Sequence, residues 1–411
     1  MNAVATPVVP ALRPYFNDRH TQLWHEADAF AAEHVAPRTA RMEAAPGRVE
    51  RKIAALMAAK RWFAVTVPAA LGGMEAGHVA RTILIHRIAC ESAAAAAILQ
   101  ATLIPVGALL NFGTDEQQRR WLPPVADGSG LLSIAVTEPS AGGHIGGIET
   151  FAERDGNDWI ITGAKAHIGN SHLAKTHLVV ARTAQAVPAD RALTAFMVES
   201  SCPGFSVAAH RPGLGLRGFT AGRLDLDRVR VRDDDRVGDV GGGLDVAQSS
   251  SILYGRLNLA ALGVGLHEAV MTTTTAYLKA RPRYGSTLSD HPVLRGRIGG
   301  MEACLRAARA LAYQAAHCLD QGLSCDPDLI TAKLLGAQWA AQSVQDAMEL
   351  HGAQALDTDY PLQRLWRDTQ HLYPPAGTGE VQRIRLAEEA LGESRHQWSE
   401  RFATLPSPAA P

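Results

Sequence analysis

The sequence lacks an excess of charge of either sign. Its 411 residues include 40 Lys and Arg against 41 Asp and Glu, so the formal net charge at pH 7 is −1. Proteins that bind nucleic acid or an anionic membrane surface usually carry a positive field. We therefore expect neither nucleic acid nor a membrane among the partners.

Cysteine is also scarce, and its spacing argues against two kinds of stabilising site. The five cysteines, at positions 90, 202, 304, 318 and 325, form no C-x-x-C pair. An odd number with this spacing is typical of reduced thiols rather than a disulfide framework or a zinc site, so we expect no metal. The chain also lacks an N-terminal signal pattern and an uninterrupted apolar run of about 18 residues. These absences predict a cytoplasmic protein.

What is present divides the chain into three regions. Residues 1–130 show helical spacing, with a capping box at Thr114-Asp-Glu-Gln117 and a buried helix or helix pair over 78–110. Residues 131–244 contain short β-type runs separated by Gly, Asp and Pro, which predicts an antiparallel β domain. Residues 245–402 return to helices, and 403–411 are expected to be disordered. The fold class is therefore α+β with three domains.

Finer patterns locate individual elements. The β-type runs cover 131–137, 159–162, 177–182, 193–198 and 223–231. In the last of these the period of two slips once, which predicts a bulge. Apolar residues at steps of three and four over 298–319 and 330–348 predict two long antiparallel helices, with Asp326 as N-cap and Pro327 as first residue of the second.

A glycine motif in the middle region is misleading. Gly213-Leu-Gly-Leu-Arg-Gly218 matches G-x-G-x-x-G. A β-type run follows it, whereas dinucleotide binding requires the motif to open a helix. We reject a Rossmann interpretation.

Two other segments have the character of ligand-binding loops. The stretch 371–383, HLYPPAGTGEVQR, breaks helical sequence with two prolines and then offers a helix start at Thr378-Gly-Glu380. The stretch 135–143, AVTEPSAGG, places Thr137 before a turn at Gly142 and Gly143 whose backbone could approach a flat or anionic ligand. For the second stretch alone, an ordinary hairpin turn is equally acceptable.

Taken in order, several segments resemble the acyl-CoA dehydrogenase superfamily. They are AVTEPSAGG, WIITGAKAHIGN, LRGFTAGRLDLDRVRV, RPRYG at 281–285, LHG at 350–352 with DYP at 359–361, and RD at 367–368 leading to AGTGEVQ at 376–382. The resemblance spans about 16–392. It implies an N-terminal all-α domain, a middle antiparallel β-barrel, a C-terminal four-helix bundle, and a homodimer or homotetramer.

The resemblance also implies that FAD binds between the β domain and the C-terminal helices. Val136 and Thr137 would line the flavin ring, and Gly142 and Gly143 would approach the phosphates of cofactor and substrate. Arg281 and Tyr284 of a neighbouring subunit would contact the pyrophosphate and the adenine. The remaining cofactor positions implied are His167, Gly169, Glu349, Gly352, Ala353, Thr378 and Glu380.

The chain departs from the family pattern at the catalytic base. Members usually carry a glutamate at the position of Ala376, which removes the α-proton of the acyl thioester. A second known location, directly before a family arginine, corresponds to Gly255 preceding Arg256. Because such a proton is weakly acidic, loss of the base costs roughly 10²–10⁴ in rate. The backbone N–H of Ala376 could still polarise the thioester carbonyl.

Further departures lie around the expected flavin. The family's W-I-T triplet is His167-Ile168-Gly169, and Gly143-His144 replaces Ser-Asp. Glu349 and Pro292 replace glutamines, and Ala353 and Ala355 replace glycines. A carboxylate at Glu349 would repel a pyrophosphate unless it is paired or protonated.

Five side chains are alternative bases by residue type. They are Tyr254, His144, His167, His351 and Tyr373. For each one, an ordinary packed or solvent-facing role is the competing interpretation.

We therefore expect a flavin-dependent oxidoreductase acting on an acyl thioester, bound to CoA or to an acyl carrier protein, without standard base-assisted desaturation. A substrate that loses a carboxylate or sulfinate would need no enzyme base. Two alternatives stay open: a redox-inactive or non-flavin member that performs a non-redox reaction or supports a partner, and a flavin monooxygenase of the same fold.

Overall fold

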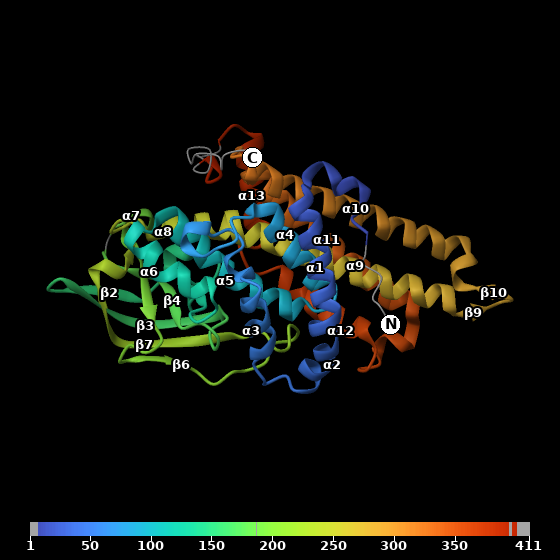
Figure 1. Ribbon diagram of the computed structural model, residues 1–411, viewed down its shortest axis with the longest axis horizontal. Helices are drawn as coiled ribbons and strands as arrows, with labels where there is room; N and C mark the ends of the chain where they lie inside the picture. Colours follow the sequence, from blue (N-terminus) through green and yellow to red (C-terminus); the bar gives the residue numbers. More distant parts are fainter. Residues whose placement is uncertain (1–6, 186, 394–396, 401–411) are drawn as a thin grey trace.

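The computed structural model describes residues 7–185, 187–393 and 397–400, and shows helices, then strands, then helices along the chain. The molecule is elongated (Figure 1). A β-sheet occupies one end, long helices reach the other end, and the N-terminal helices pack between them. The expected order of all-α, β and helical regions is confirmed. The disordered tail expected over 403–411 lies outside the described residues.

Six α-helices form the N-terminal region: α1 (Asp18–Phe30), α2 (Ala36–Ala44), α3 (Arg51–Ala59), α4 (Gly77–Ala89), α5 (Ala93–Phe112) and α6 (Asp115–Ala126). The capping box is present, since Thr114 and Gln117 exchange backbone-to-side-chain hydrogen bonds of 3.0 and 3.2 Å. The run expected as a buried helix or pair is the pair α4 and α5. Helix α5 is long and apolar enough to cross a membrane, but it is mostly buried, as the core helix of a soluble protein is.

Eight strands form the middle region: β1 (Leu132–Ala135), β2 (Phe151–Asp155), β3 (Asp158–Gly169), β4 (Thr176–Arg182), β5 (Leu193–Glu199), β6 (Phe205–Val207), β7 (Ala221–Arg232) and β8 (Arg236–Val237). They make one sheet in the order β6-β7-β3-β2-β4-β5-β8, with β1 also on β4. Most pairs are antiparallel, as expected, but β4 pairs with β1 and with β2 in parallel. The short strands β2, β6 and β8 were not predicted.

The predicted bulge in β7 is present. Ile161 pairs with Val229, whereas Gly163 pairs with Leu226, so β7 contains one more residue than β3 between these pairs. Arg228 lies in this stretch with a φ of 53°. The extra residue explains why the apolar period slips while Leu226 and Val229 both stay buried.

The C-terminal region begins with α8 (Gly243–Ser250), a π-helical turn η7 (Ser251–Arg256) and α9 (Leu257–Ala280). A hairpin of β9 (Pro282–Arg283) and β10 (Ser286–Thr287) leads to α10 (Pro292–Asp320), α11 (Asp326–His351), α12 (Pro361–Thr369) and α13 (Gly379–Ala390). Helices α9, α10 and α11 pack against one another, and α12 packs on α9 and α11. Helix α4 also packs on α9 and α10, so one core runs through both helical regions.

One predicted helix cap is wrong. Cys325, not Asp326, is the N-cap of α11, and Asp326 is the first helical residue. The Asp326 carboxylate instead accepts hydrogen bonds from the backbone N–H groups of Trp398 (2.7 Å) and Ser399 (2.9 Å). This carboxylate therefore ties the start of α11 to the C-terminal segment.

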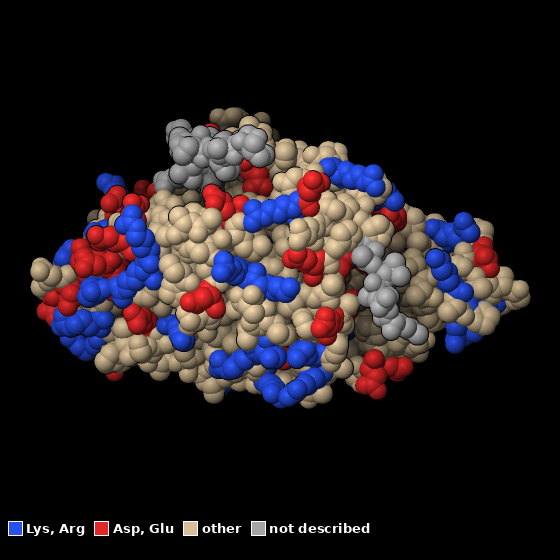
Figure 2. Space-filling view, viewed as in Figure 1, with Lys and Arg blue, Asp and Glu red and all other residues tan. Residues whose placement is uncertain are grey.

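On the sheet end, basic and acidic side chains lie intermixed (Figure 2). Arg230 on β7, for example, contacts Asp155 and Asp158, and Arg154 on β2 contacts Asp233. These pairs are exposed, so each contributes little to stability.

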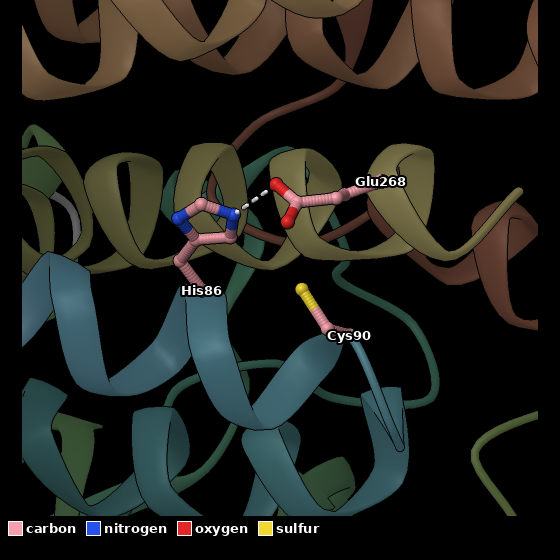
Figure 3. Close-up of side chains that lie close together, drawn as sticks. All are labelled: His86, Cys90 and Glu268. Carbon is pink, nitrogen blue, oxygen red and sulfur yellow. Dashed lines mark hydrogen bonds and ion pairs between the residues drawn. The ribbon is translucent and has the colours of Figure 1, made fainter. Parts of the chain in front are cut away.

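A different charge network is buried between α4, α9 and α10. His86 and Cys90 approach Glu268 of α9, and the ligand atoms of the three lie within 4.8 Å of one another (Figure 3). The Glu268 carboxylate accepts hydrogen bonds from Arg87 (2.7 Å), Arg309 (3.0 Å) and His86 (3.0 Å). Two guanidinium groups at this carboxylate oppose a metal cation, so the cluster is an ion-pair network that joins the two helical regions.

We predict that Glu268→Gln lowers the free energy of unfolding by about 3–5 kcal/mol, because it leaves the buried Arg309 without its carboxylate partner and the buried Arg87 with Asp28 as its remaining one. Glu302→Gln on α10 removes the exposed partner of Arg306 and is the matched control, with a loss below about 0.5 kcal/mol. Urea denaturation of both variants checks this. Equal losses of unfolding free energy would show that the buried Glu268 network contributes no more to stability than an exposed ion pair.

Buried histidines predict acid sensitivity. Burial lowers the pKa of His86 and His267 to about 4 and that of His177 to about 3. Their folded-state pKa values lie below the unfolded value near 6.5, so the stability from keeping them neutral is full above pH 6.5. It is lost as the pH falls from 6.5 toward 4, at about 1.4 kcal/mol per pH unit for each proton taken up on unfolding. Denaturant titrations at pH 7 and pH 5 check this, and equal unfolding free energies would contradict it.

Candidate functional site

The loop that carries Ala376 lies between a 3₁₀ turn at Gln370–Leu372 and α13. Ala376 and Gly377 both have positive φ, 57° and 93°. Glycine adopts this conformation freely, but an alanine there is strained. The surrounding contacts must therefore hold the loop in this shape. Thr378 is the N-cap residue of α13, as the sequence predicts, and Glu380 is exposed in its first turn.

Ala376 faces Gly255, the other position where relatives carry the base. A Cβ added to Gly255 would lie 3.1 Å from the Ala376 Cβ, 3.7 Å from the Ser251 Oγ and 3.8 Å from the Ile104 Cδ1. Gly255 belongs to the π-helical turn η7, a feature often found at functional sites. The two positions thus share one small space, and neither supplies a carboxylate to it.

Arg256 holds this loop from the α9 side. Its Nε donates to the carbonyl oxygen of Ala376 at 3.3 Å, and the side chain is buried. Burial lowers the pKa of Arg256 to about 10, so it stays charged at neutral pH. Arg256 therefore positions the loop and brings positive charge beside the space between Gly255 and Ala376.

Val136 and Thr137 follow β1 and are half-buried. Their carbonyl oxygens are already satisfied: the Lys165 Nζ donates to Val136 (3.0 Å), and the Ala166 N–H donates to Thr137 (2.8 Å). This fixes the backbone from the side of β3. It fits a role for the two residues in lining a flat ligand.

A buried ion pair supports the same segment and was not anticipated from the sequence. The Glu138 carboxylate accepts from the Lys165 Nζ at 2.7 Å, and also from the backbone N–H groups of Glu149 (2.7 Å) and Thr150 (3.0 Å). Burial opposes the charge of Glu138, but the Lys165 ammonium and these hydrogen bonds outweigh it and lower the pKa of Glu138. The sequence feature that could have indicated this pair is Lys165, a lysine within the apolar run of β3.

The glycine turn after β1 is open. A Cβ added to Gly142 or Gly143 would have no heavy atom within 4 Å. His144 is exposed, and its ring lies over its own turn, 3.0 Å from a Cβ added to Gly147. The backbone of this turn is therefore accessible to a phosphate-bearing ligand.

At the W-I-T position, His167 is exposed and Gly169 is partly covered. A Cβ on Gly169 would lie 3.0 Å from the Phe219 Cζ and 3.2 Å from the Ala101 Cβ. Phe219 therefore fills space that a side chain at 169 would need. This aromatic was not singled out from the sequence, although it follows the Gly213–Gly218 motif directly.

The remaining cofactor positions lie at the other end of the molecule. Arg281 and Tyr284 belong to the β9–β10 hairpin region, opposite the sheet (Figure 1), and the Tyr284 side chain is 92% exposed. Glu349 lies in the last turn of α11, where it contacts Arg297 near the start of α10, and Gly352 and Ala353 follow it. One chain thus does not bring these residues to its own Val136 and Thr137. For Arg281 and Tyr284, the resemblance implies a contribution from a neighbouring subunit, which stays a prediction.

Glu349 shares one arginine with Asp346, so the repulsion that its carboxylate would exert on a pyrophosphate is reduced. Its Oε2 accepts from the Arg297 Nη2 at 2.8 Å, and the same arginine binds Asp346 at 2.8 Å. The arginine offsets part of the negative charge that a pyrophosphate would meet.

The alternative bases are scattered. Tyr254 is enclosed, with the Arg81 guanidinium 4.0 Å from its ring centre, and burial raises its pKa. His351 is buried against Tyr277, with ring centres 4.1 Å apart, and its Nδ1 lies 2.8 Å from the Ala347 carbonyl oxygen. Tyr373 is partly exposed on the loop itself, and burial raises its pKa too. None of these contacts places a base in the space between Gly255 and Ala376.

These observations fit FAD. The glycine turn is open, and hydrogen bonds from β3 hold the backbone of Val136 and Thr137. Arg297 offsets part of the charge of Glu349. Residues at opposite ends of the molecule would hold the cofactor, with Arg281 and Tyr284 expected from a neighbouring copy.

Comparisons with known proteins identify the family of all three domains. Three family models match: the acyl-CoA dehydrogenase N-terminal domain over 17–129, its middle domain over 133–229 and its C-terminal domain over 241–391. An acyl-CoA dehydrogenase of Bacillus subtilis (strain 168) is 31% identical over 80% of this chain and 86% of its own length.

Solved structures extend the similarity to the whole fold. A glutaryl-coenzyme A dehydrogenase in complex with glutaryl-CoA has a TM-score of 0.88 and 26% identity, over 93% of this chain and 98% of the other. PigA in complex with FAD has a TM-score of 0.86 and 25% identity, over 92% and 98%. Together with the three matching domain models, these similarities show that the chain belongs to the acyl-CoA dehydrogenase family.

Proposed function

We propose that this protein is an FAD-dependent oxidoreductase that acts on an acyl thioester without a side-chain carboxylate as base. The observation that supports the proposal is the contact between Gly255 and Ala376, where a Cβ added to the first would lie 3.1 Å from that of the second. The space where relatives place a proton acceptor is bounded here by small or neutral groups. We propose a cytoplasmic homodimer or homotetramer, with the thioester carried by CoA or an acyl carrier protein.

The substrate class that suits this space carries its own leaving group in place of the α-proton. In a thioester with a carboxylate on the α-carbon, the bond between these two carbons breaks and CO₂ leaves. The electron pair stays behind as the enolate of the thioester. Loss of a hydride from the β-carbon then gives the unsaturated thioester, and no proton is removed by the enzyme. A sulfinate would leave as SO₂ in the same sense.

Bound FAD would supply the acceptor for that hydride. The chain's own groups bind and orient the substrate. The loop backbone at Ala376 offers N–H groups to the thioester oxygen, and Arg256 adds positive charge behind the loop. Small residues at 255 and 376 leave room for the departing group.

The direct test is anaerobic reduction of the FAD-loaded protein. We expect visible flavin absorbance to bleach with an alkylmalonyl thioester, accompanied by CO₂ release, and to persist with the matching acyl thioester that lacks the carboxylate. Equal bleaching by both would show that an enzyme base exists. Failure of the purified protein to bind FAD would favour the redox-inactive alternative, which the changes at His167 and Gly169 motivate. Dependence on oxygen and an external reductant would favour the monooxygenase.

Restoring the base makes a second prediction. Ala376→Glu keeps a Cβ where one already exists, so the scaffold should accept it. We expect the variant to exchange the α-proton of a plain acyl thioester with deuterated water, by NMR, at least about 100-fold faster than the natural protein.

Two variants control this experiment. Ala376→Gln has the same size without the acceptor and should show no gain in exchange. Gly255→Glu should gain less than Ala376→Glu, because its Cβ crowds the Ala376 Cβ. A natural protein that already exchanges the α-proton as fast as Ala376→Glu would contradict the absence of a base.

A further inference from the structure

Lys333 of α11 lies beneath the Ala376 loop and is almost fully buried. Its Nζ donates to the carbonyl oxygens of Tyr373 and Gly377, each at 2.9 Å. These two carbonyls lie on either side of Ala376, so a single ammonium group spans the strained part of the loop. The Gly377 carbonyl also accepts from the Gln382 Nε2 of α13, at 2.6 Å.

The loop depends on such side-chain donors. Residues 373–377 belong to no helix or strand, and within the described part of the chain they form no backbone–backbone hydrogen bond. Pro374 and Pro375 have no N–H to offer. Side chains supply the missing donors: Lys333, Gln382 and Arg256 bind three of the loop's carbonyls.

This arrangement fixes the direction of the N–H groups. In a trans peptide the C=O of one residue and the N–H of the next point to opposite sides, and the described part of the chain has no cis peptide. Because Arg256 binds the Ala376 carbonyl, the Gly377 N–H is turned away from it. Because Lys333 and Gln382 bind the Gly377 carbonyl, the Thr378 N–H is turned away from them.

The two cations also lack a close counter-ion. No described carboxylate lies within 4.0 Å of a nitrogen of Lys333 or Arg256, while both side chains are buried. Burial, followed by the charge of Arg256, lowers the pKa of Lys333 to about 7, and Glu380 opposes this shift only from the exposed first turn of α13. Lys333 is therefore only partly protonated near neutral pH, and both its charged and its neutral form can donate to the two carbonyls. A group that gathers negative charge on the loop would relieve this excess of positive charge.

We propose that Lys333 is a positioning residue, which with Arg256 clamps the loop carbonyls on both sides of Ala376 and so holds the backbone N–H groups of the loop, that of Ala376 included, in the orientation that binds the oxygen of the substrate's thioester. This inference rests on the proposed function for the identity of the ligand. The clamp itself stands on the hydrogen bonds alone, so the two parts are tested separately.

The clamp is tested by hydrogen–deuterium exchange of the peptide covering 371–383 in the ligand-free protein. Lys333→Met removes both hydrogen bonds of the ammonium group while keeping a side chain of similar size. We expect the loop amides to exchange about tenfold faster. Lys333→Arg keeps the charge and the donors and should retain most of the protection. Arg309→Met is the control, because it weakens the buried Glu268 network on α10 without touching the loop.

The role in binding is tested with butyryl-pantetheine and its S-butyl thioether, which lacks the carbonyl oxygen. We expect the natural protein to bind the thioester more tightly than the thioether. Lys333→Met should lose about tenfold of this preference, while Arg309→Met keeps it.

Unchanged exchange in a folded Lys333→Met protein, or equally fast exchange in Arg309→Met, would overturn the clamp. Faster exchange with an unchanged thioester preference would overturn the oxygen-binding role while leaving the clamp. If the natural protein binds neither pantetheine compound, the oxygen-binding role and the proposed ligand fail together, and the exchange result still decides the clamp.

Discussion

Docking of the Ala376 loop onto α9 and α11 is the contact on which the rest of the site depends. The loop has two prolines, a strained alanine and few backbone hydrogen bonds of its own, so it cannot keep its shape unaided. Charged donors buried under it provide that shape, at the cost of desolvating an arginine and a lysine. The long helices in turn hold these donors in place, because they share a core with α4 and α5. The helical bundle thus supports the loop rigidly.

Much of the fold follows from local patterns. Apolar spacing identified the long helices, and the slipped period of β7 correctly placed its bulge, since an extra residue must be absorbed between two buried positions. Both signals come from residues that are close together in the sequence. Such signals could not predict the parallel pairing of β1 with β4, because it brings together segments some 40 residues apart. The short strands β2, β6 and β8 have too few residues to show a clear alternation.

The site was only partly visible from the sequence for a related reason. The motif resemblance identified the Ala376 loop and Gly255, but only the fold shows that these positions touch. Asp326 was assigned as a cap from its place before a proline, whereas tertiary contacts with the C-terminal segment use its carboxylate instead. Lys165 and Lys333 escaped notice because each lies among apolar residues, where a lysine has a clear meaning only once its partner is known. Lys165 meets a carboxylate, and Lys333 meets carbonyl oxygens.

This contrast between the two lysines clarifies what loss of the glutamate changes. Lys165 and Glu138 neutralise each other, so that pair fixes the backbone without projecting charge. Lys333 and Arg256 have no such close partner, and a glutamate at 376 would add negative charge to the loop they hold. With alanine there, the charge of Arg256, and that of Lys333 when it is protonated, remains available to whatever the loop binds. A site that has no carboxylate at 255 or 376 and keeps this charge suits a substrate that arrives with negative charge or develops it on its thioester oxygen. In the function that we propose, carbanion formation by loss of a carboxylate meets both conditions, whereas proton removal from a neutral acyl chain would need an acceptor that positions 255 and 376 do not provide.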